Sequence, residues 1–445
     1  MTAPDHGSPR RRSSALALAA GCLFAACDGG PPPPGERPLA PAENDPDFRV
    51  ERVRNWLIIG NDLTPGQDTV DVQVFAPDGV ETIDAWLGDQ PGVRLYHSEE
   101  GDFRQIIEAG DLPAGEHELL LAADGSDQAF ARLVVRRSHP LYVVVSTDWD
   151  DSDNHDYTLE LQEQLHLRHP ELRLTHFVGP YTFTDPEVTA ERRTQLAAWV
   201  LDMRDTYDDE IGLHIHPYCN FVDTTGVPCR TEPSTVYADG DVTGYTVMCS
   251  AYSEEEFTQL LLAADELFAE AGLGKPTSFR AGGWTTSLDT LRALAAAGYV
   301  ADTSANNWAR MEEWEGVQNG VLYEWNKEHW ATIGDTSQPY YPSQDDILSD
   351  SAPVVPLLEV PDNGIMVDYV TAEEMIEIFD ANWDGAPLAA PVAYSIGYHP
   401  PNFNTTYQGR ISGALRHVEQ FLVSRDQGPV IFATLSELAR VWPPP

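Results

Sequence analysis

The segment LYVVVSTDWDDSDNHD, residues 141–156, decides the fold of this chain. Its first five residues are all apolar and mostly β-branched, which is typical of a strand buried on both faces. The strand ends in a cluster of carboxylates: Asp148, Asp150, Asp151, Asp153 and Asp156. In barrel and open-sheet enzymes the chemistry lies at the carboxyl ends of buried strands. The segment therefore predicts an α/β domain with a site at this strand end.

From residue 139 to residue 445, apolar runs alternate with helical patterns. Strands are expected at 141–147, 172–178, 211–216, 277–280, 299–301, 357–360, 392–396 and 430–433. Helices are expected at 158–166, 188–204, 254–271, 288–297, 372–381 and 411–425. Three helix starts carry capping boxes: Ser253 with Glu256, Thr371 with Glu374, and Thr434 with Glu437. This alternation predicts parallel β/α units that close into a barrel or form a wide sheet.

Two long insertions interrupt the alternating pattern, at residues 219–250 and 306–352. The first carries Cys219, Cys229 and Cys249, and the second is rich in Trp and Tyr. Both follow strand ends, so we expect both to overhang the same rim. In an oxidising compartment two of the three cysteines are expected to pair, and Cys219–Cys229 would close the shorter loop.

The part that precedes the alternating domain has a different pattern. Residues 47–138 contain short strand-like runs separated by turn signals, which predicts an all-β sandwich of immunoglobulin type. We expect it to act as a spacer or lid, with glycan binding as the alternative role. Residues 28–46 form a proline-rich linker.

The first 27 residues read as a targeting segment, because three arginines precede an apolar stretch of signal-peptide length. Two small residues precede Cys27 as in a bacterial lipobox, and Cys22 is a competing site. We expect a lipoprotein exported to the cell envelope and anchored at Cys27, with a secreted protein as the alternative.

Composition excludes some partners. The 445 residues include 71 acidic and 27 basic side chains, a formal net charge of −44. Such a surface repels phosphate backbones and anionic lipid, so we expect no nucleic-acid partner and membrane contact only through the lipid anchor. The apolar content of 42% with eleven Trp indicates a folded chain.

A pair of histidines lies on a second predicted strand, in the sequence EIGLHIHP at residues 210–217. His214 and His216 are two residues apart, so they point to the same face, about 6.6 Å apart along the strand. Two imidazoles on one face can bind one metal ion, and a carboxylate as third ligand leaves positions open for water and substrate. With the acidic strand end earlier in the domain, these two histidines are predicted metal ligands.

Three further strand ends carry polar side chains that hydrolysis uses. Arg280 follows a strand and precedes two glycines and Trp284, so its guanidinium could pin a catalytic carboxylate. Asp302 and His399 end later strands. Each alone is a weak signal, but together five strand ends carry such groups.

In this order the motifs resemble the polysaccharide deacetylases of the NodB-homology type, carbohydrate esterase family four. The resemblance covers residues 141–440 and implies a deformed (β/α)7-type barrel. It also implies a metal-dependent hydrolase that removes N- or O-acetyl groups from an extracellular or cell-envelope polysaccharide. One difference is that the family's histidines are usually four residues apart, whereas here they are two apart, as in a divergent HxHP branch.

The resemblance implies roles that the aspartates can fill in two ways. If the acidic motif is aligned by its spacing, Asp150 is the catalytic base and Asp151 the metal ligand. If strand alternation governs, Asp148 is the base and Asp150 the ligand. We prefer the first alignment because it keeps the motif's spacing. In either case Arg280 would orient the base, and His399, held by Asp302, would protonate the leaving amine.

Zinc is the first choice of metal, although this ligand set also suits iron, cobalt or nickel. Aromatic residues could form a sugar-stacking rim for an N-acetylated polysaccharide, namely Trp284, Trp308, Trp314, Trp325, Tyr340 and Tyr341. One alternative is a catalytically inactive, carbohydrate-binding lipoprotein on the same scaffold. A calcium-binding adhesin is a weaker alternative, because the acidic segment lacks the glycine and final Glu of an EF-hand loop.

Overall fold

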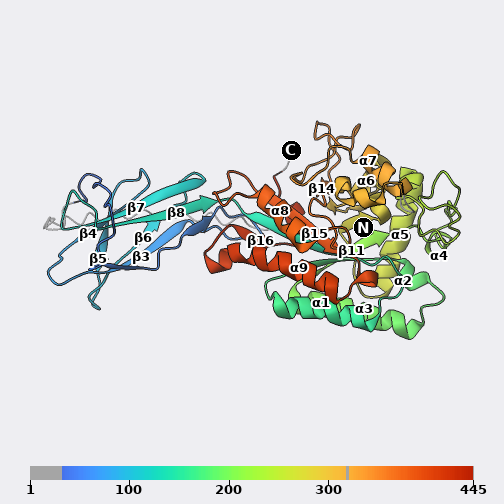
Figure 1. Cartoon of the computed structure of the whole chain (residues 1–445), viewed down its shortest axis with the longest axis horizontal. Helices are drawn as coiled ribbons and strands as arrows, with labels where there is room; N and C mark the ends of the chain where they lie inside the picture. Colours follow the sequence, from blue (N-terminus) through green and yellow to red (C-terminus); the bar gives the residue numbers. More distant parts are fainter. Residues whose placement is uncertain (1–32, 317–319, 444–445) are drawn as a thin grey trace, which may run out of the picture.

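The computed structural model describes residues 33–316 and 320–443, and it contains two sheets in an elongated molecule (Figure 1). The predicted signal peptide, with Cys22 and the predicted lipidation site Cys27, lies outside the described residues. Within the described ranges, no helix combines the length and apolar character needed to cross a membrane.

The first sheet is built by the N-terminal part of the chain. Its strands are β1 (Arg49–Glu51), β2 (Trp56–Ile58), β3 (Thr69–Phe75), β4 (Ile83–Leu87), β5 (Val93–His97), β6 (Phe103–Glu108), β7 (Gly115–Ala123) and β8 (Ala131–Ser138). They run in the order β1-β3-β6-β5-β4-β7-β8-β2, antiparallel except for the β2–β8 pair. An apolar core of Val, Leu, Ile and Phe side chains packs within it. This part consists of strands, as predicted, while the immunoglobulin-like sandwich stays a prediction.

The second sheet is parallel and curled, with helices around it (Figure 1). Its strands are β9 (Leu141–Asp148), β10 (Leu174–Val178), β11 (Glu210–Ile215), β12 (Ser278–Ala281), β13 (Ala301–Asp302), β14 (Leu358–Glu359), β15 (Val392–Tyr398) and β16 (Val430–Phe432). The order is β14-β13-β12-β11-β10-β9-β15, and β16 also pairs with β9. The predicted mixed α/β architecture with parallel strands is therefore observed.

The helices are α1 (Asp156–Arg168), α2 (Tyr181–Thr184), α3 (Ala190–Tyr207), α4 (Cys219–Val222), α5 (Glu254–Glu270), α6 (Leu288–Ala297), α7 (Gly320–His329), α8 (Ala372–Asn382), α9 (Thr405–Val418) and α10 (Leu435–Val441). The three predicted capping boxes are present at α5, α8 and α10. The predicted helix at 411–425 is observed in part as α9, which begins six residues earlier and ends at Val418. It begins there because the side chain of Asn404 caps it by accepting from two backbone N–H groups.

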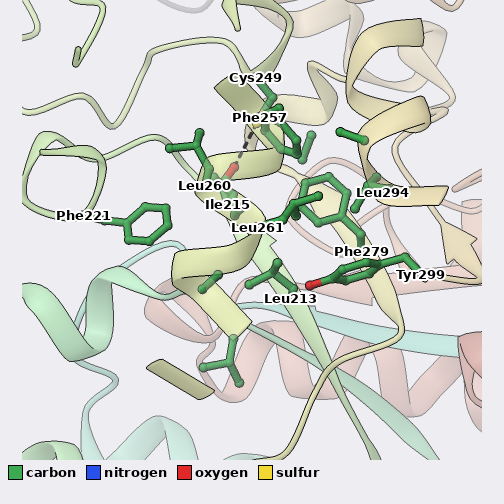
Figure 2. Close-up of a cluster of buried hydrophobic side chains, with 14 of the residues drawn as sticks. Leu213, Ile215, Phe221, Cys249, Phe257, Leu260, Leu261, Phe279, Leu294 and Tyr299 are labelled. Carbon is green, nitrogen blue, oxygen red and sulfur yellow. Dashed lines mark hydrogen bonds between the residues drawn. The ribbon is translucent and has the colours of Figure 1, made fainter. Parts of the chain in front are cut away.

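Strand β9 is the centre of the parallel sheet. It pairs with β15 over Leu141–Thr147 and with β10 from Val145 onward, and all eight of its residues are buried. Strand β11 lies two strands away from β9, on the other side of β10. On β11, side chains that pack in the core alternate with side chains that face the site. Leu213 and Ile215 point into an apolar cluster with side chains of α5 and α6 (Figure 2). His214 between them therefore faces the opposite side of the sheet.

Hydrogen bonds and an aromatic contact join the two sheets, in addition to the chain connection between them. Strand β8 passes into β9 through His139 and Pro140, and the Asp426 carboxylate accepts from the backbone N–H groups of Asn55 and Trp56 at the start of β2. The Trp56 ring also contacts that of Trp383 edge to face, 6.0 Å between centroids. Asp426 has a left-handed backbone, φ 57°.

We expect Asp426→Gly to lower the free energy of unfolding by about 2 kcal/mol, because it removes charge-assisted hydrogen bonds and keeps the backbone conformation accessible. Asp208→Gly is a matched control, since Asp208 is also left-handed (φ 59°) but its carboxylate makes only an exposed ion pair. Urea unfolding of both variants measures the difference. Equal stability of the two variants would contradict the role of Asp426 as a joint.

Candidate active site

Three side chains converge at the carboxyl ends of β9 and β11. The Asp150 Oδ1 lies 3.1 Å from Nε2 of His214 and 3.5 Å from Nε2 of His216. Among the described residues, these three form the group of ligand-type side chains whose donor atoms all lie within 4.8 Å of one another. Both histidines are buried, and the Asp150 side chain is 17% exposed.

The hydrogen bonds of the imidazoles determine what this group can bind. Nδ1 of His214 lies 2.9 Å from the carbonyl oxygen of Arg280, and Nδ1 of His216 lies 2.7 Å from that of Tyr245. A carbonyl only accepts, so each Nδ1 must carry the hydrogen. In a neutral imidazole each Nε2 then presents a lone pair to the Asp150 carboxylate. Three lone pairs facing one point fit a cation, and two N and one O donors with open positions suit a transition metal.

The backbone of β12 fixes the rings of this trio. The register pairs His214 with Arg280, which places the carbonyl of Arg280 beside the imidazole. At the next turn Gly282 lies against His216, since a Cβ at residue 282 would lie 2.6 Å from that ring. The ring of His216 also stacks on that of Tyr245, 4.4 Å between centroids. The histidine side chains are therefore held by contacts from two directions.

The course of β9 decides which aspartate joins the trio. The backbone N–H of Trp149 still bonds to the carbonyl of Phe177, so strand pairing with β10 continues past Asp148. Trp149 is buried in the apolar cluster behind the sheet, and Asp148 and Asp150 both line the cavity in front of it. Asp151 follows the strand and is exposed. Among the described residues it is therefore Asp150, and not Asp151, that groups with the two histidines, which favours the alignment by strand alternation over the preferred one.

Asp148 is the second functional carboxylate. Its Oδ1 accepts from the Arg280 guanidinium at 3.0 Å, and both side chains are almost fully buried. Arg280 also donates to Ser146 and Thr303 and lies 3.5 Å from Asp362, so its position is fixed from several sides. Burial alone would lower the pKa of Arg280, but Asp148 and Asp362 raise it, so the guanidinium stays charged.

His399 lies at the end of β15 and lines the same cavity. Its Nδ1 is 2.9 Å from Oδ2 of Asp368. Burial would lower the pKa of His399, but the carboxylates of Asp368, Asp150 and Asp148 outweigh burial and raise it to about 10. Conversely, burial would raise the pKa of Asp150, and His399, His216 and His214 hold it well below its usual value. At neutral pH the site therefore contains a protonated His399 near the ionised Asp150.

The role predicted for Asp302 is corrected. The Oδ1 of Asp302 accepts from Ser304 at 2.8 Å, and its strand register places it opposite Glu359 of β14. Burial raises the pKa of Asp302 to about 6 and raises that of Glu359 well above its usual value. Asp302 thus belongs to a buried carboxyl pair within the sheet. The partner of His399 is Asp368, carried by a segment that bridges to β15 through Met366 and Gly397.

A cavity of about 300 Å³ opens onto these groups. Its aromatic lining residues are Tyr237, Tyr245, Trp284, Trp314 and Tyr369. Both predicted insertions contribute to it, as expected from their positions after strand ends. Trp284 is therefore at the site, and its Nε1 donates to Asp362 at 3.3 Å. Tyr340 and Tyr341 are not among the described lining residues; the Tyr340 hydroxyl donates to the carbonyl of Ile347.

The first insertion is closed by the predicted disulfide. Among the cysteines described, Cys219 and Cys229 are bonded and Cys249 keeps a buried thiol. The Sγ of Cys249 lies 3.2 Å from the carbonyl of Ile215, which is visible as the dashed line in Figure 2. Cys219 is three residues after His216, so the disulfide is anchored next to the metal-type ligands.

No protein-family model matches the sequence, and no curated protein matches it. Among solved structures the chain is similar to a family 4 carbohydrate esterase from Streptomyces lividans, at 11% identity and a TM-score of 0.34, over 68% of this chain and 97% of that one. It is also similar to a family 4 acetyl xylan esterase from Clostridium thermocellum, at 14% identity and a TM-score of 0.33, over 67% of this chain and 89% of that one.

A 4-α-glucanotransferase from Thermococcus litoralis matches at 11% identity and a TM-score of 0.37, over 67% of this chain and 40% of that one. The family named by the motif resemblance, carbohydrate esterase family four, is thus represented among the matched structures. With all these TM-scores below 0.5, the assignment of function depends on the geometry of the site.

Two contributors to the site carried no recognisable sequence signal. Asp368 follows no predicted strand, and its pairing with His399 depends on how the segment 362–368 crosses the end of β15. Tyr245 lies inside the cysteine-bearing insertion, where nothing distinguishes it from neighbouring aromatic residues. A spacing argument cannot find either residue, because both reach the site from irregular segments.

We expect Gly282→Ala to weaken metal binding by about 10-fold or more, because the new Cβ would displace the His216 ring. Gly409→Ala is the control, since a Cβ at residue 409 meets nothing within 4 Å. Competition with a chromophoric chelator measures Zn²⁺ and Co²⁺ affinity for both variants. Unchanged affinity in Gly282→Ala would show that His216 is not a ligand.

Proposed function

We propose that this protein is a metal-dependent hydrolase that removes N- or O-acetyl groups from a polysaccharide outside the cytoplasm. The observation that supports this most directly is the trio Asp150, His214 and His216, whose three lone pairs face one point in the cavity. The pairs Asp148–Arg280 and His399–Asp368 line or adjoin the same cavity. Metal site, base and acid are the components that amide or ester hydrolysis requires.

A metal ion bound by the trio would polarise the acetyl carbonyl and lower the pKa of a water molecule toward 7. Asp148 is the group placed to take the proton from the attacking water. Arg280 fixes the orientation of Asp148 through a buried, charge-assisted hydrogen bond.

His399 is the group placed to complete the reaction. When the carbon–nitrogen bond of an N-acetyl group breaks, the leaving nitrogen needs a proton, and a protonated imidazole can donate it. Asp368 holds Nδ1 of His399, so the acidic hydrogen faces the cavity from Nε2. The products are acetate and a free amine on the sugar, and the base and acid return to their starting states by exchange with water.

The aromatic lining suits a carbohydrate, because sugar rings stack on aromatic faces. Zinc is the first choice for the metal on the basis of its donor set. The signal-peptide pattern supports export, with a lipid anchor at Cys27, to the cell envelope. The immunoglobulin-like sandwich before the barrel is part of this proposal and would act as a spacer that carries the catalytic domain away from the membrane.

We expect the purified protein to release acetate from an N-acetylated glycan, and we expect a chelator to abolish the release. His214→Ala should lose both activity and metal, because two remaining ligands bind weakly. His417→Ala is the control, since His417 pairs with Asp380 outside the described cavity lining. Release that survives both the chelator and His214→Ala would overturn the metal-hydrolase proposal.

Absence of release from every glycan, with intact binding of glycan and metal, would instead favour a carbohydrate-binding protein without turnover. Asp148→Asn distinguishes loss of the catalytic base from loss of the metal in the same assay. It should keep metal affinity, because Asp148 is outside the trio, and lower kcat by about 10²- to 10⁴-fold.

The pH dependence of kcat/KM tests the role of Asp368. The raised pKa of His399 keeps the imidazole protonated at neutral pH, so acid catalysis is lost only as pH rises through that pKa. We expect Asp368→Asn to lower the pKa of His399 and to shift the alkaline limb by about 1 to 2 units toward lower pH. Asp380→Asn, which removes the carboxylate beside the half-buried His417, should leave the limb in place.

Bound metal affects the Asp368→Asn and Asp380→Asn proteins alike. The difference between their pH profiles therefore reports the effect of Asp368 alone. An alkaline limb that stays where it is in Asp368→Asn would remove His399 from the role of acid.

A further inference from the structure

One residue of the first insertion contacts two members of the trio through two different groups. The hydroxyl of Tyr245 donates to Oδ2 of Asp150 at 3.0 Å, and its carbonyl accepts from Nδ1 of His216 at 2.7 Å. Its ring stacks on the imidazole of His216. These contacts act on the atoms that do not face the proposed metal position, so they orient the atoms that do.

We propose that Tyr245 is the positioning residue of the metal site, fixing the tautomer of His216 and the rotation of the Asp150 carboxylate together. Because the phenol donates to Oδ2, the rotation of the carboxylate is fixed and Oδ1 of Asp150 is the oxygen that would bind a metal ion. Because the carbonyl takes the hydrogen of Nδ1, Nε2 of His216 is left as a donor. The inference rests on the metal site of the proposed function, but not on the reaction.

The loop around Tyr245 is held firmly enough for this role. The carboxylate of Asp241 accepts from the backbone N–H groups of Thr243 and Thr246, which lie on either side of Tyr245, at 2.7 Å each. A turn closed on both sides of a residue leaves its backbone little freedom to rotate. The carbonyl that receives His216 is therefore fixed by bonds that lie outside the trio.

The same loop is clamped onto the segment that follows His216. The backbone N–H of Cys219 donates to the carbonyl of Thr243 at 2.7 Å. Gly244 approaches so closely that a Cβ there would lie 2.4 Å from the carbonyl oxygen of Pro217. The disulfide Cys219–Cys229 closes the base of the insertion. The insertion thus delivers Tyr245 to the trio from the end of the strand that carries the histidines.

The test is the metal affinity and Co²⁺ absorption spectrum of Tyr245→Phe, measured on the full chain without substrate. This variant keeps the ring and the carbonyl and removes only the hydroxyl. We expect about a 10-fold loss of Zn²⁺ affinity in chelator competition and a changed visible spectrum of the Co²⁺ protein, since Asp150 becomes free to rotate. Affinity within twofold of the unmodified protein, with an unchanged spectrum, would overturn the proposal.

Tyr394→Phe is the matched control for a merely structural effect. Tyr394 is also buried and also donates a hydrogen bond, to the carbonyl of Met375 at 2.7 Å, but it is not among the described residues that line the cavity. Both variants should lose similar thermal stability, and only Tyr245→Phe should lose metal affinity. Equal affinity losses in the two variants would also overturn the proposal.

Asp241→Ala provides a second variant if Tyr245→Phe does not fold. Releasing the turn should weaken Zn²⁺ affinity several-fold, and a folded Asp241→Ala protein with unchanged affinity would count against the proposal. The outcome is separable from that of the proposed function. A chain that binds metal through Tyr245-oriented ligands and releases no acetate would retain this inference and lose the other. A chain that binds no transition metal would lose both.

Discussion

The site depends on two hydrogen bonds from imidazole Nδ1 atoms to backbone carbonyls. Because a carbonyl cannot donate, the bonds to Arg280 and Tyr245 leave the Nε2 atoms of His214 and His216 without hydrogens when the rings are neutral. Those lone pairs then face a carboxylate, which is unfavourable unless positive charge lies between them. Two parts of the fold supply these carbonyls. The pairing of β11 with β12 supplies the carbonyl of Arg280, and the first insertion supplies that of Tyr245.

Strand alternation is the second constraint. On β11 it sends Leu213 and Ile215 into the apolar cluster and leaves His214 for the cavity, and on β9 it places Trp149 in the same cluster. The two-residue alternation of side chains along a strand therefore determines both which residues lie in the core and which residues face the cavity. A shift of register by one residue would bury a histidine in an apolar cluster and expose a leucine in the cavity. The packing energy of the core thus protects the arrangement of the site.

The same constraint explains what could be predicted from sequence. The order of strands and helices follows from hydrophobic patterns, and the histidine pair follows from its spacing of two. The choice among Asp148, Asp150 and Asp151 depended on how far β9 continues, and the motif's spacing favoured Asp151 where the structure groups Asp150 with the histidines. The Trp149–Phe177 bond, which extends the strand, is a tertiary contact. Asp368 was missed for a similar reason, because an irregular segment brings it to His399.

Burial then determines which of the clustered carboxylates carry charge. Glu359, which lies opposite Asp302, has a pKa raised well above its usual value by burial and by that neighbouring carboxylate, so negative charge is disfavoured in this pair. Asp150 differs, because its pKa lies well below the usual value and the charge of the nearby His399 contributes most to lowering it. Negative charge is therefore kept at the open cavity and reduced inside the sheet. An acidic cluster at a strand end can thus bind a cation without the sheet behind it being destabilised by uncompensated charge.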